Sequence, residues 1–235
     1  MVSSFSIVHL IVLLNLSSFV TAFLAPVKPH ALHRLQTTRQ NLFGDMFEQA
    51  GPLGKGITVA QVSVCVSSPS ILPTLNLIAS SNSGTTPSAL SRLASETCLS
   101  LLRLEDSWVS ASSRYTHFST SQAGKAESEY NLWSTKLASK YEKEYPVSSG
   151  GAGEEGGGLV VATLLLEMQG DKTIFQDAGR SYGQTKDVLS SIAADVKVDG
   201  GRLVNAVEVF WCPGDVGEIL EKRDVLLDFP ELIDL

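Results

Sequence analysis

The residues of this sequence that could perform chemistry are few and widely spaced. Cys65, Cys98 and Cys212 are odd in number and far apart, which is not the spacing of a disulfide framework or of a paired-cysteine metal site. His117 is the single histidine after residue 33, and one histidine without paired cysteines does not make a zinc site. We therefore expect three reduced thiols and no metal-binding residue.

The environment of each thiol follows from its place in the predicted elements. Cys65 shares a strand face with Gln61 and Ser63, so we expect its thiol to be accessible, whereas Cys98 falls on the buried stripe of a helix. A redox-sensing thiol would need a lowered pKa, and no basic residue lies next to any of the three cysteines. The pattern favours unreactive thiols and leaves a redox sensor as the alternative.

Other motifs resemble functional ones in letters but not in context. Residues 151–156 match G-x-G-x-x-G, yet this segment leaves a predicted helix and enters a predicted strand, the reverse of a dinucleotide-binding turn. Glu154 and Glu155 within it would repel a pyrophosphate, and residues 51–55 lack the spacing of a phosphate-binding loop. A Ser-His-Asp triad would have to use His117, which we expect on the surface at a strand end, with no activated serine beside it. We identify no catalytic or cofactor-binding residue, expect no cofactor, and predict a protein that is not an enzyme.

The elements that would position any site follow from the periodicity of apolar residues. Ser68–Pro69 and Thr86–Pro87 are typical of helix starts, and Thr185 is expected to cap a further helix. The predicted strands are 57–66, 108–118, 159–168 and 203–211, and the predicted helices are 68–78, 86–102, 122–145 and 185–196, before a helical turn in 223–232. The order β-α-α-β-α-β-α-β predicts one α+β domain, residues 56–235, with a single four-stranded sheet and helices packed on it.

Some positions within these elements have a stated expectation. Residues 159–168 are almost entirely apolar, which predicts an interior strand buried on both faces. The hydroxyl of Thr163 should find a partner inside, and Glu167 is expected near the rim. Tyr130 and Trp133 belong to one continuous face of the longest helix. We interpret that face as core, with a pigment or cofactor shelf as the alternative.

Two glycine-rich segments are expected to be flexible. Residues 51–56 form a lead-in to the first strand, and residues 146–158 form a low-complexity loop inside the domain. Shortening the loop 150–158 should change the free energy of unfolding by only about 0.6 kcal/mol for each halving of its length.

Charge is distributed unevenly along the chain. All 25 acidic residues lie from Asp45 onward, together with 15 of the 18 basic residues, so this part carries a net charge of −10. A domain of this sign repels nucleic acid and anionic membranes, and we expect no nucleic-acid partner. Hydrophobic residues make up 43% of the chain, enough for a packed core without metals or disulfides.

The first residues have the composition of a targeting sequence in two parts. An apolar stretch over 5–20 is shorter than the roughly 20 residues of a membrane span, and Ala22 suits a signal-peptidase cut. Phe23 then opens an acid-free segment with the composition of a transit peptide. We predict a signal peptide over 1–22 and a plastid transit peptide with linker over 23–50, processed between Ala22 and Phe23.

A signal peptide followed by a transit peptide that begins with phenylalanine resembles the bipartite presequences of algae with secondary plastids, such as diatoms. This resemblance implies the plastid as location, in the stroma or peripheral to the thylakoid. Secretion is the alternative, and three unpaired cysteines and the lack of an N-x-[ST] sequon after the leader speak against it. No window after the leader reaches transmembrane length, so any membrane association would be peripheral.

The body of the chain resembles a family of cyanobacterial and plastid proteins known as a domain of unknown function, DUF1517, which includes the chloroplast fluctuating-light acclimation protein. The likeness begins with the strand at Ile57 and the helix that ends near Leu102. It continues through segments 108–112, 126–131, 160–166, 207–211 and 227–232. The resemblance implies a role in adjusting photosynthesis to changing light and supplies no catalytic residue.

Three functions remain open from the sequence. We favour a regulatory or assembly factor that acts through contacts with plastid or thylakoid proteins. A small-molecule binding module for a lipid or tetrapyrrole is the first alternative, and it would need an apolar cavity lined by Tyr130, Trp133 and residues 159–168. A hydrolase or transferase is the second, and it would need converging polar groups with shifted pKa values.

Overall fold

A computed structural model describes residues 50–146, 158–214 and 218–235. One antiparallel sheet runs through this part of the chain, and its five strands lie in the order β4-β3-β1-β2-β5. The strands are β1 (Ile57–Val66), β2 (Trp108–Phe118), β3 (Val160–Gln169), β4 (Val204–Cys212) and β5 (Ile233–Asp234). The predicted count of four was wrong, because β5 has two residues and therefore no alternating pattern that a sequence could reveal.

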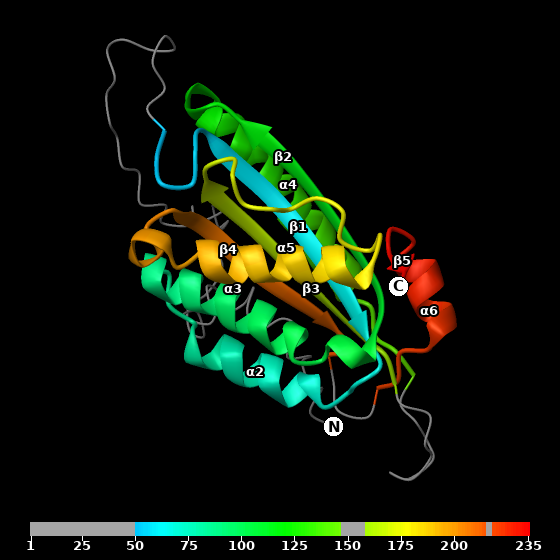
Figure 1. Cartoon of the computed structure of the whole chain (residues 1–235). Coiled ribbons are helices and arrows are strands. Elements are labelled where there is room, and N and C mark those ends of the chain that lie inside the picture. Colours follow the sequence, from blue (N-terminus) through cyan, green and yellow to red (C-terminus); the bar gives the residue numbers. More distant parts are fainter. Residues whose placement is uncertain (1–49, 147–157, 215–217) are drawn as a thin grey trace, which may run out of the picture.

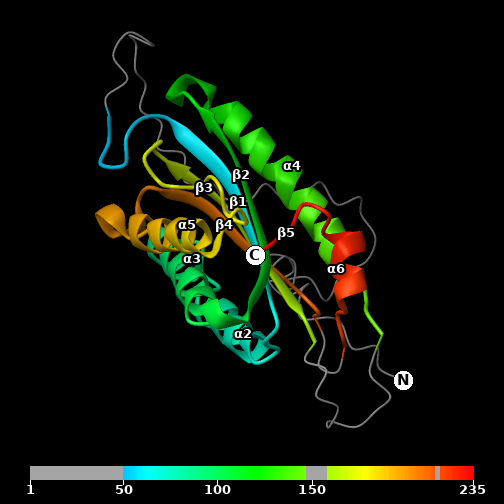
Figure 2. The ribbon, with the colours of Figure 1, turned by 45° about the vertical axis from the view of Figure 1, so that its right-hand side comes forward.

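Helices cover both faces of this sheet (Figures 1 and 2). The helices are α2 (Ile71–Ser81), α3 (Pro87–Leu102), α4 (Ala123–Tyr141), α5 (Tyr182–Asp195) and α6 (Lys222–Asp228), and short 3₁₀ turns span Glu105–Ser107, Thr120–Gln122 and Val198–Gly201. Seen along the sheet in Figure 2, α2, α3 and α5 lie on one side and α4 and α6 on the other. The molecule is thus an α+β sandwich of three layers, as predicted in class.

The strand predicted to be interior is interior. β3 lies between β4 and β1, and Leu164, Leu165 and Leu166 are each no more than 1% exposed. Both faces are covered, because Leu164 and Leu166 belong to the core beneath α3 and α5, whereas Leu165 belongs to the core beneath α4. An apolar run without alternation is the pattern that this double burial requires.

Helix starts were predicted with mixed success. Thr86 caps α3, since its Oγ1 accepts a hydrogen bond from the Ala89 N–H at 3.3 Å. The helix predicted from Ser68–Pro69 begins at Ile71 without a side-chain cap. Thr185 is not a cap: Ser181 precedes α5 and accepts from the Gln184 N–H at 3.2 Å, which places Thr185 one turn inside the helix.

The glycine-rich lead-in, which was predicted to be flexible, forms a hydrogen-bonded turn. The Leu53 carbonyl accepts hydrogen bonds from the N–H groups of Asp171 and Lys172, both at 3.0 Å. Gly54 has φ +100°, and a Cβ there would lie 1.8 Å from the Asp171 carboxylate. A side chain at position 54 would not fit this approach, and glycine therefore allows the turn to dock onto the end of β3. The turn directly precedes β1 in the chain.

The C-terminal segment is fastened to α4. Lys140 contacts Glu231 at 2.6 Å, and Lys143 contacts Asp228 at 2.5 Å. The helical turn predicted in 223–232 is present as α6. The chain then returns to the sheet as β5, which pairs with β2.

Some predictions fall outside the described residues. The signal peptide and nearly all of the transit segment lie before residue 50, and most of the glycine-rich loop lies within 147–157. Among the residues that are described, none of the helices has the length and apolar character needed to cross a membrane.

Candidate functional site

Polar side chains gather on one face of the sheet, the face that α4 covers. Antiparallel register brings alternate positions of neighbouring strands side by side: Ser63 faces Thr163, and Leu165 lies between Gln61 and Glu208. Side chains of alternate residues point to the same face. We call the group on this face the polar layer, and its sheet members are Gln61, Ser63, Arg114, Thr163, Glu167 and Glu208.

A chain of hydroxyl groups forms the centre of the polar layer. Thr163 Oγ1 lies 2.6 Å from Ser63 Oγ and 2.7 Å from the Tyr141 hydroxyl, and all three groups are buried. Gln61 Nε2 donates to Ser63 Oγ at 3.3 Å. The expected internal partner of Thr163 is therefore confirmed, and Tyr141 ties α4 to the sheet at this point.

Arg114 extends this network to the surface. Its Nε and Nη2 both donate to Gln61 Oε1, at 2.9 and 2.7 Å, and its guanidinium lies 4.0 Å from the ring centroid of Trp133. Partial burial lowers the pKa of the guanidinium, but an arginine remains charged at any physiological pH. The guanidinium of Arg114 thus lies between the side-chain amide of Gln61 on β1 and the indole ring of Trp133 on α4.

Glu208 marks the opposite side of the polar layer, on β4. Ser134 Oγ donates to its carboxylate at 2.7 Å, and the Tyr130 hydroxyl donates as well. Burial raises the pKa of Glu208, and burial beside this carboxylate raises the pKa of Tyr130 well above its usual value. Tyr130 therefore stays neutral at physiological pH and can donate its hydroxyl proton in the hydrogen bond to Glu208.

Glu167 does not lie at the rim, and that prediction was wrong. Its residue is 2% exposed, and its carboxylate accepts a hydrogen bond from Asn205 Nδ2 at 2.9 Å. The physical reason is the irregularity in the β3–β4 pairing at Glu167, which leaves Asn205 free of a ladder position and able to cover the carboxylate.

The three cysteines are all buried and unpaired. Cys65 was expected to be accessible but is 0% exposed, because the C-terminal segment with Phe229 belongs to the core that covers its end of the sheet. Burial raises the pKa of Cys65 to about 11 and those of Cys98 and Cys212 to about 12. These thiols are protonated at neutral pH and are poor nucleophiles.

His117 is exposed near the end of β2, as predicted. Its Nδ1 lies 3.1 Å from Thr58 Oγ1, which resembles a catalytic dyad in distance alone. The Thr58 hydroxyl, however, donates to the Gly170 carbonyl at 2.6 Å, so it accepts from the imidazole and has no proton to yield to it. The contact secures the end of the sheet and does not activate a nucleophile.

The expectation that the sequence contains no G-x-S-x-G motif was wrong, because residues 179–183 read G-R-S-Y-G. A nucleophile elbow is a sharp turn directly between a strand and a helix. Here β3 ends at Gln169, twelve positions before Ser181. Ser181 is extended, at φ −163°, and its hydroxyl bonds with Gln184. The serine is a helix cap.

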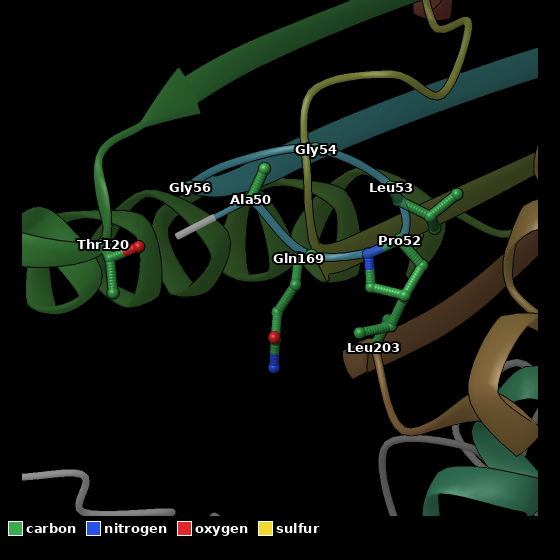
Figure 3. Close-up of a pocket in the computed structure, with 9 residues that line it drawn as sticks. Ala50, Pro52, Leu53, Gly54, Gly56, Thr120, Gln169 and Leu203 are labelled. Atoms are coloured by element: carbon green, nitrogen blue, oxygen red, sulfur yellow. The ribbon is translucent and has the colours of Figure 1, made fainter. Parts of the chain in front are cut away.

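A shallow pocket of about 290 Å³ lies at one end of the sheet, apart from the polar layer (Figure 3). Its lining comes from residues 50–54 and Gly56 of the turn, with Thr120, Gln169 and Leu203, and none of these described residues is charged. In the described ranges no group of His, Cys, Asp or Glu could hold a metal ion. The glycine motif at 151–156, with Glu154 and Glu155, lies outside those ranges.

Sequence reasoning singled out Thr163, Glu167, Tyr130 and Trp133 but not Arg114 or Glu208. A signal for the polar layer existed, because polar residues recur at alternate positions of otherwise apolar strands, as at Gln61 and Ser63. What the sequence does not contain is the register that sets these positions side by side.

The chain matches a known protein family over most of its length. The family model described as "Protein of unknown function (DUF1517)" matches residues 56–235. No curated protein and no solved structure matches the chain.

Proposed function

This chain belongs to the DUF1517 family of proteins of unknown function, and we propose that it is a non-enzymatic plastid factor that acts through protein contacts. The role that we assign to it is regulation or assembly in the acclimation of photosynthesis to changing light. The plastid location rests on the leader, with Phe23 after the predicted cut at Ala22. The light-related role rests on the resemblance to the fluctuating-light acclimation protein.

One observation carries the proposal of protein contacts. Leu226 and Leu227 are 60% and 66% exposed and lie next to each other on α6. We call these two residues the C-terminal apolar patch. Apolar side chains grouped on a surface and bordered by charges are typical of a protein interface.

The alternative of a small-molecule module needed space between α4 and the sheet. Tyr130 and Trp133 are each 5% exposed, and both fill that space themselves, one bonded to Glu208 and the other beneath Arg114. We therefore do not favour it.

The enzymatic alternative has one supporting observation, the raised pKa of Glu208 beside Tyr130. A general acid must reach its substrate, and Glu208 is engaged by Ser134 and Tyr130 beneath α4. Protein contact is the better supported function.

The location can be tested with a fusion of residues 1–50 to a fluorescent protein in an alga with a secondary plastid. We expect the fusion inside the plastid, and we expect the Phe23→Ala variant to remain outside it. Secretion of the unaltered fusion would contradict the proposal.

The contact role can be tested in a strain that lacks the gene. We expect photosystem II yield under alternating light to be restored by the full chain and not by the Leu226→Gln/Leu227→Gln variant. Leu77→Gln is the matched control, because Leu77 is 67% exposed on α2, on the other side of the sheet. Equal rescue by both variants would exclude the C-terminal apolar patch as the contact surface.

A further inference from the structure

The edge of the sheet beside the C-terminal apolar patch is mostly unpaired. β2 has eleven residues, and β5 pairs with two of them, Ser110 and Ala111. The remainder of β2, from Ser112 onward, pairs with β1 on its inner side. In Figure 1 this length of β2 forms the margin of the sheet, with α4 behind it.

The direction of the backbone groups along this margin follows from β5. The Val109 carbonyl accepts from the Leu235 N–H at 3.0 Å, and Ala111 lies opposite Ile233. Since the N–H and C=O of one residue point to the same side and alternate along a strand, those of Ser113, Tyr115 and His117 also point outward. We call these three residues the open edge. In the described part of the chain, none of the backbone hydrogen bonds outside helices and strands joins them.

Their side chains are engaged, so the edge is held in place. Ser113 Oγ accepts from the Ala178 N–H at 3.1 Å, and the Tyr115 hydroxyl donates to Gln176 at 3.3 Å. The residues between them, such as Arg114, bond inward to β1 and α4. The open edge therefore presents a row of three backbone N–H donors and three carbonyl acceptors.

The protection of this edge strand is reduced to one charged side chain. Natural edges carry charged residues, proline or a bulge that prevents pairing with another chain. Residues 112–118 contain no proline or lysine, Arg114 is engaged by Gln61 and Trp133, and the irregularity in the β1–β2 pairing lies at the other end, at Cys65 and Val66. An exposed edge of this kind accepts an added strand.

The two sides of the open edge differ in chemistry. On the α5 side, Tyr115 and Ile174 are each 46% exposed. On the α4 side, burial lowers the pKa of Arg114, and the carboxylates of Glu231 and Glu129 oppose this shift; the domain as a whole is strongly acidic. A second copy of this chain would meet like charge, whereas a basic strand would meet opposite charge.

We infer that the open edge binds an extended segment of a partner protein, antiparallel to β2, with apolar side chains toward Tyr115 and basic side chains toward Glu129. This inference deepens the proposed function, on which it rests, by naming the partner segment. Backbone pairing supplies the affinity, and the alternation of apolar and basic residues supplies the specificity.

The test uses the folded chain and two labelled peptides of nine residues, one alternating lysine with valine and the other alternating glutamate with valine. Amide hydrogen exchange is measured by NMR with each peptide. We expect slower exchange at Ser113, Tyr115 and His117 with the lysine peptide and no change with the glutamate peptide. Unchanged exchange at these three amides would overturn the inference.

Matched variants separate backbone pairing from side-chain contact. Tyr115→Ala retains the outward N–H and Tyr115→Pro removes it, while neither touches the inward bonds to β1. We expect Tyr115→Pro to bind the lysine peptide about ten-fold more weakly than Tyr115→Ala. Glu129→Gln should weaken binding, and the distant Asp187→Asn should not. Equal affinity of the two Tyr115 variants would contradict an added strand, and the exchange data on the unaltered chain decide the matter if Tyr115→Pro does not fold.

Two further outcomes are distinguishable. If raising the protein concentration alone protects the three amides, the edge pairs with a second copy and the basic partner is wrong. If Leu226→Gln/Leu227→Gln abolishes rescue under alternating light while Tyr115→Pro rescues fully, the proposed function stands and the inference about the edge falls.

Discussion

The two faces of one sheet differ in how they hold their helices. Beneath α3 and α5 the strands present Val62, Val64, Leu164, Leu166 and Val209, an apolar surface. Beneath α4 the same strands present the polar layer, in which hydroxyl, amide and carboxylate groups bond to one another and to the helix. Apolar burial is non-directional, whereas a buried hydrogen-bond network accepts one arrangement of its partners. The comparison teaches that α3 and α5 are held by packing, and that α4 is in addition held in register.

The largest loss of stability is expected from removing buried apolar side chains, because apolar burial stabilises both faces of the sheet. Leu165 and Leu166 are each 0% exposed on opposite faces of β3. Leu165→Ala and Leu166→Ala should each lower the free energy of unfolding by about 2–5 kcal/mol, through lost burial and a cavity. Equilibrium denaturation measures both, with Gln169→Ala, at the exposed end of the same strand, as control. If Leu165→Ala cost no more than Gln169→Ala, α4 would not pack closely on the sheet.

A reciprocal pair of isosteric changes tests the difference itself. Thr163→Val removes the hydroxyl that joins Ser63 to Tyr141, and Val64→Thr introduces one into the apolar face. Each should cost about 1–3 kcal/mol, since each leaves a buried polar group without its partner. Chemical denaturation of both variants provides the measurement. A more stable Thr163→Val protein would show that the hydroxyl chain contributes nothing.

A smaller effect is expected at the exposed border of the polar layer. Arg114→Lys keeps the charge but loses the planar contact with Trp133 and the paired bonds to Gln61. We expect a loss of about 0.5–1 kcal/mol. Arg202→Lys, at an exposed pair with Asp199, should change the thermal midpoint by nothing measurable. Equal midpoints for both variants would remove Arg114 from the network.

The last expectation concerns the pH dependence of stability. Because the pKa of Glu208 is raised above its ordinary value of 4.5 in the folded state, the native protein binds more protons than the unfolded chain just above that pH. The free energy of unfolding should therefore fall as the pH rises from 4.5 through the folded-state pKa. Glu208→Gln, which cannot titrate, should give a flatter profile over the same range. An unaltered slope would assign the dependence to other groups.

Much of the fold could be predicted because strong local patterns carried it. The unbroken apolar run of β3 indicated an interior strand, and Thr86 before Pro87 indicated the start of α3. Predictions failed where the deciding contact is distant in sequence. Cys65 shares a face with polar residues, yet Phe229 belongs to the core that covers it, and no pattern near Cys65 announces a residue more than 160 positions away.

In the candidate site, too, local patterns in the sequence indicated some features, and contacts between distant segments decided the others. The alternation of Gln61 and Ser63 already implied that one face of β1 is partly polar. The partners that satisfy this face, Thr163 and Arg114, come from two other strands through the register of the sheet. Glu208, which sequence reasoning did not single out, became part of a network because α4 lies over it.

By itself the sequence determined the class of the fold, the order of its long elements and the acidic character of the domain, since these depend on composition and on periodicity over a few residues. The tertiary structure alone decided the fifth strand, the docking of the turn at Leu53, the burial of Glu167 and the open edge of β2. Each of these depends on which backbone groups meet across the sheet. Such pairings are set by the lowest free energy of the whole chain, and no short segment contains them.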